Sequence, residues 1–426
     1  MRMIYYQRGS ENSVIDSQSL EEGLFSALDK IGKKKKVLVV PPDQTRIHSR
    51  AGEITALLYK YYKNDLKDIL PALGTHTPMT NNQIGEMFGD IPRDLFRVHD
   101  WRKDVVTVGT VSGDMVSQIT NGALDYSWPA QLNKIVLNGG HDLILSVGQV
   151  VPHEVMGMAN YNKNIFVGTG GHESINKSHF LGAVYGMERI MGRADTPVRR
   201  VLNYASDNFA RQMPIVYVLT VTGKNSNGQM AMKGLFIGDD YECFRLASEL
   251  SLTINFDLLD KPLKKVVVYL DPQEFKSTWL GNKSIYRTRM AIADDGELIV
   301  LAPGLREFGE DPEIDRLIRK YGYRTTPEVM QFVKENSDLQ NNLSAAAHLI
   351  HGSSENRFTV IYCPGYISRE EIESVNFRYG ELAPILARYD PAKMQDGFNI
   401  LPDGEEVFYI SNPALGLWAT KERFNN

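Results

Sequence analysis

Three residues with chemically useful side chains, His153, Lys163 and His179, lie within one 29-residue stretch of the sequence. An imidazole can transfer protons near neutral pH and can bind a transition metal. A desolvated lysine amine can form a covalent bond to a cofactor. Several glycines are interleaved with the three residues, and glycine lets a backbone turn sharply and approach a ligand closely. The stretch therefore predicts a cofactor pocket.

The segment Asp43–Arg46, which reads DQTR, contains side chains that can handle anions. The Thr45 hydroxyl and nearby backbone N–H groups can hold a phosphate, and the Arg46 guanidinium can bind a carboxylate through two parallel hydrogen bonds. Asp43 has a simpler alternative, because aspartate often caps the segment that follows it. The segment is a candidate anion-binding loop.

His99, in the sequence FRVHDW, is a second candidate for acid/base chemistry besides His153. Its imidazole suits proton transfer near neutral pH. Trp101, two residues later, is a candidate for excluding water from a reacting centre. The alternative is that His99 is a partly buried histidine paired with a neighbour and has no chemical role.

Short apolar runs alternate with amphipathic stretches, which is typical of an α/β architecture. In the first half we expect strands at 37–40, 105–108, 134–137, 143–147 and 215–221, another strand from residue 68, and helices over 51–62, 81–88 and 241–250. A helix is also expected to start close to His179. Ligands of open α/β sheets bind at the carboxyl ends of the strands. The loops that carry Asp43, Arg46, His76 and Lys163 are expected to converge there.

A polar connection around residues 260–262 predicts a domain boundary. We expect an N-terminal α/β domain over 1–262, which carries the cofactor and acid/base residues, and a smaller α/β domain over 263–426, which closes the cleft. The second half should contain strands in 264–270, 297–304 and 357–363 and helices over 284–292, 311–321, 326–335 and 344–350. The predicted fold is two α/β domains with mostly parallel sheets and an active-site cleft between them.

Length and composition exclude several classes of protein. A chain of 426 residues is too long for one ordinary core, so about two domains are expected. The net charge of -5 gives no basic surface for nucleic acid. Cys243 and Cys363 lie far apart and outside any metal-binding spacing. The sequence shows no apolar signal-peptide core and no run of ~18 apolar residues, so we expect a cytoplasmic protein that binds neither nucleic acid nor membrane.

Taken together, these motifs resemble those of the nickel-pincer-nucleotide-dependent lactate racemase family over essentially the whole chain. The most specific part is Pro152-His153, followed by Lys163 ten residues later and by His179 sixteen residues further on. The DxTR loop at 43–46, the GTH loop at 74–76 and the His-Asp pair at 99–100 support the resemblance.

The resemblance implies a cofactor and a role for each candidate residue. The cofactor is a nickel-pincer nucleotide, a pyridinium-3-thioamide-5-thiocarboxylic acid mononucleotide that carries nickel. Lys163 would form its thioamide link and His179 would bind the nickel, while His99 and His153 would act as acid and base on opposite faces of the substrate. The further site residues are predicted to be Asp43 and Thr45 for the cofactor, and Arg46, Lys283 and His76 for the substrate.

The activity implied by the resemblance is racemisation or epimerisation at C2 of a 2-hydroxy acid. One histidine removes the hydroxyl proton while the hydrogen on C2 leaves as a hydride to the cofactor, and return of the hydride to either face inverts the centre. Partners would be the enzymes that synthesise the cofactor and insert nickel, and a homo-oligomer is compatible with the sequence.

Two departures from the family pattern bear on the substrate. The usual Gly-Gly-Arg stretch before the lysine is Asn160-Tyr161-Asn162 here, and Thr77 replaces the common arginine after the GTH loop. Because such residues can pair with hydroxyl groups, we expect a larger, polyhydroxylated acid such as an aldonate, with lactate itself as the alternative. A non-catalytic cofactor-binding protein, and a zinc hydrolase built on His172 and His179, are the remaining alternatives.

Overall fold

The structure is a computed structural model that describes residues 3–225 and 228–425. The chain forms two compact units. The first comprises Met1–Ser178 and Met191–Asn255, and the second comprises His179–Ile190 and Phe256–Asn426. The short segment 179–190 thus belongs to the second unit although the chain on both sides of it belongs to the first. The sequence-based division at 262 stays a prediction.

The first unit contains a mixed six-stranded sheet with strand order β1-β10-β9-β6-β2-β3. The strands are β1 (Ile4–Gly9), β10 (Met230–Gly238), β9 (Ile215–Lys224), β6 (Leu143–Gln149), β2 (Val37–Val40) and β3 (Leu66–Ile69). The pairs β9–β6, β6–β2 and β2–β3 are parallel, whereas β1–β10 and β10–β9 are antiparallel. The parallel part places the carboxyl ends of β2, β3 and β6 at one edge.

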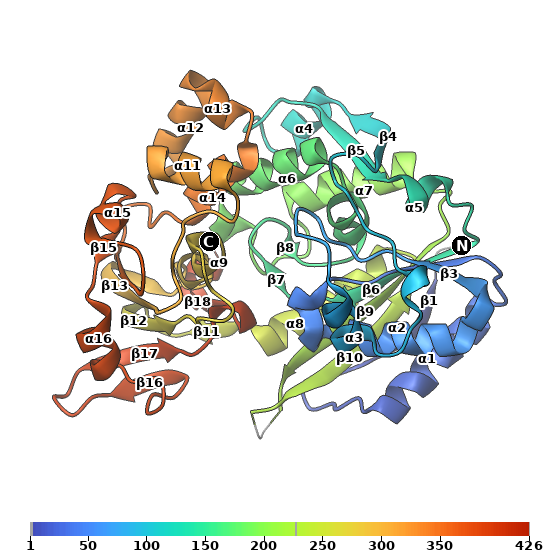
Figure 1. Ribbon diagram of the computed structural model, residues 1–426, viewed down its shortest axis with the longest axis horizontal. Helices are drawn as coiled ribbons and strands as arrows, with labels where there is room; N and C mark the ends of the chain where they lie inside the picture. Colours follow the sequence, from blue (N-terminus) through green and yellow to red (C-terminus); the bar gives the residue numbers. More distant parts are fainter. Residues whose placement is uncertain (1–2, 226–227, 426) are drawn as a thin grey trace. The chain divides into compact units, whose positions relative to one another are not determined.

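Helices cover both faces of this sheet. The helices of the first unit are α1 (Ser17–Ile31), α2 (Ala51–Tyr62), α3 (Asn81–Phe88), α4 (Gly113–Ile119), α5 (Lys134–Asn138), α7 (Pro197–Phe209) and α8 (Tyr241–Asn255). Helix α6 (His172–Tyr185) belongs to the first unit up to Ser178 and to the second unit from His179. Alternation along β2 sends Val37 and Val39 toward α1, α2 and α3, where they share one buried cluster. Helix α8 packs against β9 and β10 (Figure 1).

Shorter elements complete the first unit. Two antiparallel pairs are β4 (Val105–Val111) with β5 (Trp128–Asn133), and β7 (Pro152–His153) with β8 (Gly157–Met158). The 3-10 turns are η1 (Gln44–Ser49), η2 (Lys63–Asp65) and η3 (Arg93–Leu95), and η4 (Asn164–Gly168) is a π-helix. Several of these short elements carry the predicted site residues.

The second unit contains another six-stranded sheet, ordered β15-β14-β13-β12-β17-β16. Its strands are β12 (Leu263–Tyr269), β13 (Ile292–Ala302), β14 (Thr359–Pro364), β15 (Arg378–Tyr379), β16 (Gly397–Ile400) and β17 (Glu406–Ile410), with a separate parallel pair β11 (Asp257–Leu259) and β18 (Trp418–Thr420). Only β16–β17 is antiparallel within the large sheet. Both units are therefore α/β with mostly parallel central strands, as predicted.

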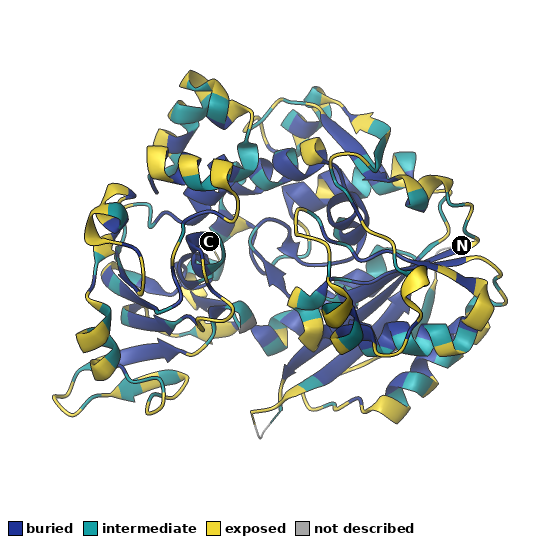
Figure 2. Ribbon diagram, viewed as in Figure 1, coloured by how far each residue is buried: buried dark blue, intermediate teal, exposed yellow. Residues whose placement is uncertain are grey.

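The helices of the second unit are α9 (Thr278–Gly281), α10 (Lys283–Tyr286), α11 (Pro312–Tyr321), α12 (Thr326–Glu335), α13 (Ser337–Gln340), α14 (Leu343–His351), α15 (Arg369–Ser374), α16 (Leu382–Arg388) and α17 (Lys421–Asn425), with 3-10 turns η5 (Met187–Arg189) and η6 (Pro413–Leu415). Figure 2 shows the central strands of each sheet as buried. Among the residues that the structure describes, no helix is both long and apolar enough to cross a bilayer.

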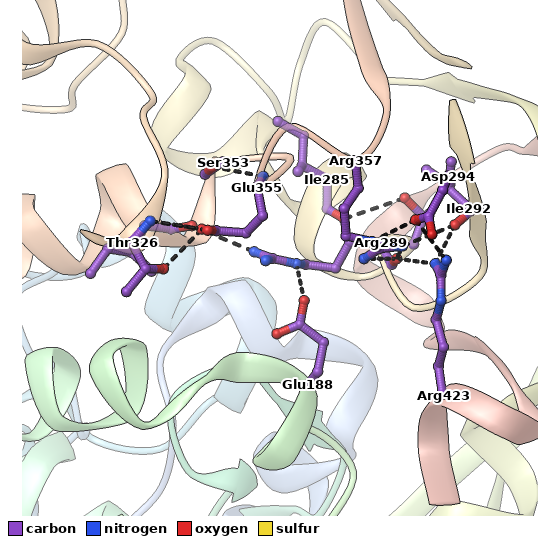
Figure 3. A network of polar contacts seen from close by, with 12 residues as sticks. Glu188, Ile285, Arg289, Ile292, Asp294, Thr326, Ser353, Glu355, Arg357 and Arg423 are labelled. Carbon is purple, nitrogen blue, oxygen red and sulfur yellow. Dashed lines mark hydrogen bonds and ion pairs between the residues drawn. The ribbon is translucent and has the colours of Figure 1, made fainter. Parts of the chain in front are cut away.

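An ion-pair network ties the segment after α6 to the rest of the second unit (Figure 3). Arg289 is buried, and its Nε lies 2.6 Å from Glu188 Oε1 in η5. Nearby, Arg357 and Arg423 each place a nitrogen 2.9 Å from Asp294 Oδ1. Without Glu188, the buried charge of Arg289 would be left uncompensated. This ion pair therefore holds η5, in the segment that follows His179, against the rest of the second unit.

The predictions for residues 134–137 and 284–292 are wrong. The run 134–137, predicted as a strand, is the helix α5, and the strand β5 lies just before it. Asn133 starts this helix by accepting a hydrogen bond from Ile135 N, and a short apolar run alone does not distinguish helix from strand. The helix predicted over 284–292 is confined to α10, and the Arg287 carbonyl accepts a hydrogen bond from Trp418 N instead.

Candidate active site

Lys163 lies immediately before the π-helix η4, at the carboxyl edge of the first sheet. The next residue, Asn164, donates from its side-chain amide to Val40 O at the end of β2 and to Ser146 Oγ in β6, both at 3.0 Å. The Thr169 N–H bonds to Asn164 O, the spacing of a π-turn. π-turns occur frequently at functional sites. These contacts fix Lys163 at the strand ends, as the sequence predicted.

The electrostatic surroundings of Lys163 favour its neutral amine. Burial lowers the pKa of Lys163 most, the positive charges of Arg46 and Arg199 add to this decrease, and Glu154 and Asp43 act in the opposite direction, which together bring the pKa to about 8. An ordinary lysine has a pKa near 10.4. A much larger fraction of Lys163 is therefore unprotonated and nucleophilic near neutral pH.

His76 and Asp43 form a hydrogen-bonded pair. His76 Nδ1 lies 2.5 Å from Asp43 Oδ2, and half of the histidine side chain is exposed, whereas Asp43 is buried. An ionised carboxylate only accepts hydrogen bonds, so Nδ1 carries the proton and the lone pair of the neutral ring is on Nε2. Gly74, in the left-handed region at φ +58°, shapes this loop, and its N–H bonds to Gly168 O. The pair has the geometry of an oriented general base.

The same carboxylate also organises the loop that carries Arg46. Asp43 Oδ1 accepts hydrogen bonds from Thr45 N at 3.1 Å and from Thr45 Oγ1 at 2.5 Å. Burial alone would raise the pKa of Asp43, but the hydrogen bonds from His76 and Thr45 outweigh it and lower the pKa. Among the described residues, the Arg46 guanidinium has neither a hydrogen-bond nor an ion-pair partner. It is therefore available to an anionic ligand.

An Asp43→Asn variant should be less stable than the wild type by about 2 kcal/mol, because it removes charge-assisted hydrogen bonds from a buried position. A lowered carboxyl pKa stabilises the fold above the unfolded pKa near 3.8, and this contribution is lost as pH falls through the folded pKa. Thermal unfolding of both proteins at pH 6 and pH 3 measures the effect. An equal difference in Tm at the two pH values would contradict this origin.

His99 is enclosed by protein groups. Its Nε2 lies 3.0 Å from Gly170 O, and its Nδ1 lies 2.9 Å from the Asn133 amide nitrogen. A carbonyl oxygen can only accept, so Nε2 donates and Nδ1 accepts from Asn133. Burial lowers the pKa of His99 and favours this neutral form. Both ring nitrogens thus have internal partners, which is the arrangement of a structural histidine.

His153 is buried in the short β7–β8 pair. Its Nδ1 accepts hydrogen bonds from Val155 N at 3.1 Å and Met156 N at 3.4 Å. Because two backbone N–H groups point at Nδ1, the neutral ring carries its proton on Nε2. In its neutral form His153 thus carries an N–H on Nε2, whereas His76 carries a lone pair there.

His179 and Lys283 belong to the second unit. Lys283 begins α10, with Nζ 5.6 Å from the centre of the Phe275 ring. His179 lies well inside α6, so the predicted helix start beside it is wrong. The polar residues before His179 suggested a helix cap, but they form contacts within α6: Lys177 pairs with Glu173, and Ser178 Oγ donates to Ser174 O.

The zinc alternative finds no support in the side chains. His172 stacks on Trp101 with ring centres 5.4 Å apart, and its Nε2 lies 2.9 Å from the Asn176 amide. Within residues 3–225 and 228–425, no group of three or more His, Cys, Asp or Glu side chains is placed to hold a metal ion. This finding concerns sites in which the protein supplies three or more metal ligands. A cofactor that carries its own metal ligands needs fewer ligands from the protein.

Asn160-Tyr161-Asn162, the stretch that departs from the family pattern, faces the interior. Asn160 and Tyr161 have left-handed φ angles of +66° and +58°. The Asn162 amide donates to Asn203 Oδ1 and Ser206 Oγ in α7 and accepts a hydrogen bond from Arg199. Sequence reasoning missed Arg199, although its spacing to Leu202 and Ala205 on the buried side of α7 was a usable signal.

Comparisons with known proteins identify a domain match and a shared fold. The family model of the lactate racemase N-terminal domain matches residues 10–190. This part of the chain is similar to that domain. The matched lactate racemase domain includes Asp43, His76, Lys163 and His179. No curated protein matches the chain.

Two solved structures share the fold of the whole chain. A protein from Thermotoga maritima is 24% identical, with a TM-score of 0.78, and the match covers 97% of this chain and 100% of that one. The lactate racemase apoprotein from Thermoanaerobacterium thermosaccharolyticum is 18% identical, with a TM-score of 0.71, and the match covers 97% of this chain and 94% of that one. At these identities the likeness establishes the fold.

Proposed function

We propose that the protein inverts C2 of a 2-hydroxy acid with a nickel-pincer nucleotide attached to Lys163. The observation that carries the proposal is the Lys163 amine, whose pKa is lowered to about 8 within a lactate racemase N-terminal domain. A neutral amine at the end of two parallel strands suits a covalent anchor. Bound there, the cofactor would supply the hydride acceptor that the inversion requires.

The residues around Lys163 fit such a cofactor and an anionic substrate. Arg46 lies close enough to lower the pKa of Lys163 and has no partner of its own among the described residues. Its guanidinium suits a carboxylate or a phosphate. Thr45 adds a hydroxyl beside it. His179 is proposed as the nickel ligand and Lys283 as a second contact to the substrate carboxylate, and these two roles rest on the motif spacing.

For proton transfer we propose His76 and His153 as the two groups. The His76 Nε2 lone pair, oriented by Asp43, can accept the hydroxyl proton of the substrate. His153 places an N–H on Nε2 that can bond to the oxygen of the keto acid. His99 was predicted in the place of His76, but Asn133 and Gly170 occupy both of its nitrogens. The geometry therefore favours His76 as the base.

The substrate class is less restricted than the sequence implied. The expected preference for a polyhydroxylated acid rested on Asn160, Tyr161 and Asn162, and the Asn162 side chain is already bonded to α7 and Arg199. An aldonate-like acid remains the proposal, and this observation favours lactate as the second candidate. Competition between lactate and an aldonate for the holoenzyme decides between them.

The proposal is tested on protein made together with the cofactor-synthesis enzymes. Intact mass and peptide mapping should find an adduct on Lys163, and substrate deuterated at C2 should keep its deuterium while chiral chromatography shows inversion. An active sample with unmodified Lys163 would refute the anchor. Loss of deuterium to solvent would indicate proton abstraction from C2 instead of hydride transfer.

A further inference from the structure

Arg199, near the start of α7, is a buried cation beside the segment that leads to Lys163. The side chain is fully buried. Its Nη1 donates to Asn160 O at 3.2 Å and to Asn162 Oδ1 at 2.5 Å, and its Nη2 donates to Met158 O at 2.7 Å. One guanidinium therefore binds three acceptors within five consecutive residues.

No carboxylate compensates this charge among the described residues. The guanidinium instead lies over the Phe244 ring at 4.4 Å and near the Tyr161 ring at 5.9 Å. Burial lowers the pKa of Arg199 to about 10, against the opposing effect of three tyrosines. Burying a cation without a counter-ion is costly. We therefore expect the buried Arg199 guanidinium to have a role besides packing.

The segment that Arg199 holds is unusual. Asn160 and Tyr161 are left-handed, a conformation that non-glycine residues adopt only when the surroundings impose it. The Tyr161 ring is fixed by Tyr217 at 4.3 Å and by Phe244 at 5.1 Å. The strained turn ends one residue before Lys163, so its geometry determines where the Lys163 side chain begins.

We propose that Arg199 is a positioning residue, which holds the Met158–Asn162 turn and thereby sets the orientation and reactivity of the Lys163 amine. The proposal rests on the proposed function only where it concerns cofactor attachment. The charged groups that act on Lys163 are Arg46, Glu154, Asp43 and Arg199. Of these groups, Arg199 also binds the backbone that leads to the lysine.

The chemical test uses the full chain without cofactor. Brief acetic anhydride labelling from pH 6 to pH 10, read by peptide mass spectrometry, gives a labelling midpoint for Lys163, with exposed Lys103 as the internal reference. The wild-type midpoint should lie near 8. Arg199→Met should raise it by about half a unit or more because a nearby positive charge is lost. Arg199→Lys keeps the charge and should restore the midpoint.

Cofactor attachment separates orientation from charge. After co-production with the cofactor-synthesis enzymes, both Arg199→Lys and Arg199→Met should carry about tenfold less adduct than wild type, because misplacing a reacting group by 1 Å is costly. Arg200→Met is the matched control, since Arg200 is exposed and pairs with Asp195. A folded Arg199→Met protein with the wild-type midpoint and wild-type adduct would overturn the proposal.

Should Arg199→Met fail to fold, Asn162→Ala takes its place. This variant keeps the charge and removes one of the three acceptors. It should keep the midpoint and lose adduct severalfold, and wild-type loading would overturn the proposed clamp. A failure of the proposed function gives a different result. The wild-type protein would then show the low labelling midpoint of Lys163 but would not acquire an adduct.

Discussion

Lys163→Arg protein, made together with the cofactor-synthesis enzymes, is expected to carry no adduct and to show no inversion at C2. Arginine keeps the positive charge and nearly the length of lysine, but its guanidinium stays protonated and cannot act as the nucleophile. The fold should tolerate the change because the neighbouring Asn164 contacts to Val40 and Ser146 are retained. Intact mass and chiral chromatography of the product measure the two losses.

The matched control for this variant is Lys103→Arg, at a highly exposed lysine. It should load cofactor and turn over like the wild type. An adduct on the Lys163→Arg protein would show that attachment occurs elsewhere. Full activity without an adduct would remove the covalent anchor from the mechanism, while leaving the match of residues 10–190 to the lactate racemase N-terminal domain unaffected.

Much of the fold could be predicted because its signals are local. The run Val37–Val40 is apolar throughout and follows four lysines, so a buried strand was the simplest interpretation, and the structure confirms it as β2. The helix over 51–62 is likewise confirmed as α2. The errors at 134–137 and beside His179 arose where a polar residue had two interpretations, as a cap or as part of a helix.

The partners of the candidate site residues could not be predicted, because they are distant in the sequence. Asn133 bonds to His99 across 34 residues, and His76 bonds to Asp43 across 33. Asp100 is the neighbour of His99 in the sequence, yet the fold gives that histidine an amide and a carbonyl as partners. The local sequence identifies side chains that are capable of catalysis. Tertiary packing determines which of them already form hydrogen bonds within the protein.

The same limit applies to Asn160-Tyr161-Asn162. As sequence, the stretch adds polar groups near the lysine and suggests a substrate with several hydroxyls. In the structure, Asn160 and Tyr161 adopt left-handed φ angles that glycine adopts at no steric cost, and Tyr161 joins an aromatic cluster with Tyr217 and Phe244. The departure from the family pattern is compensated by Arg199 and α8, so it carries less information about the substrate than its position suggests.

His76→Asn and His153→Asn are each expected to reduce the rate of inversion by about 10²–10⁴-fold, the usual contribution of a general acid or base. Asparagine keeps a hydrogen-bonding group at the position of Nδ1, so the contact of His76 with Asp43 and the acceptor of His153 can persist. Rates are measured with each enantiomer and normalised to the Lys163 adduct. The equilibrium constant fixes the ratio of kcat/KM in the two directions, so each variant should lose the same factor in kcat/KM with both enantiomers.

His99→Gln separates the two assignments of the base. Glutamine can still donate a hydrogen bond toward Gly170 O, so adduct-normalised inversion should stay within severalfold of the wild type, while the Tm falls because the Asn133 contact is lost. The opposite pattern, with inversion lost in His99→Gln at an unchanged Tm and retained in His76→Asn, would return the acid/base role to His99. In that case its bonds to Asn133 and Gly170 must open during turnover, and hydrogen exchange at the Gly171 and His172 amides would reveal such opening.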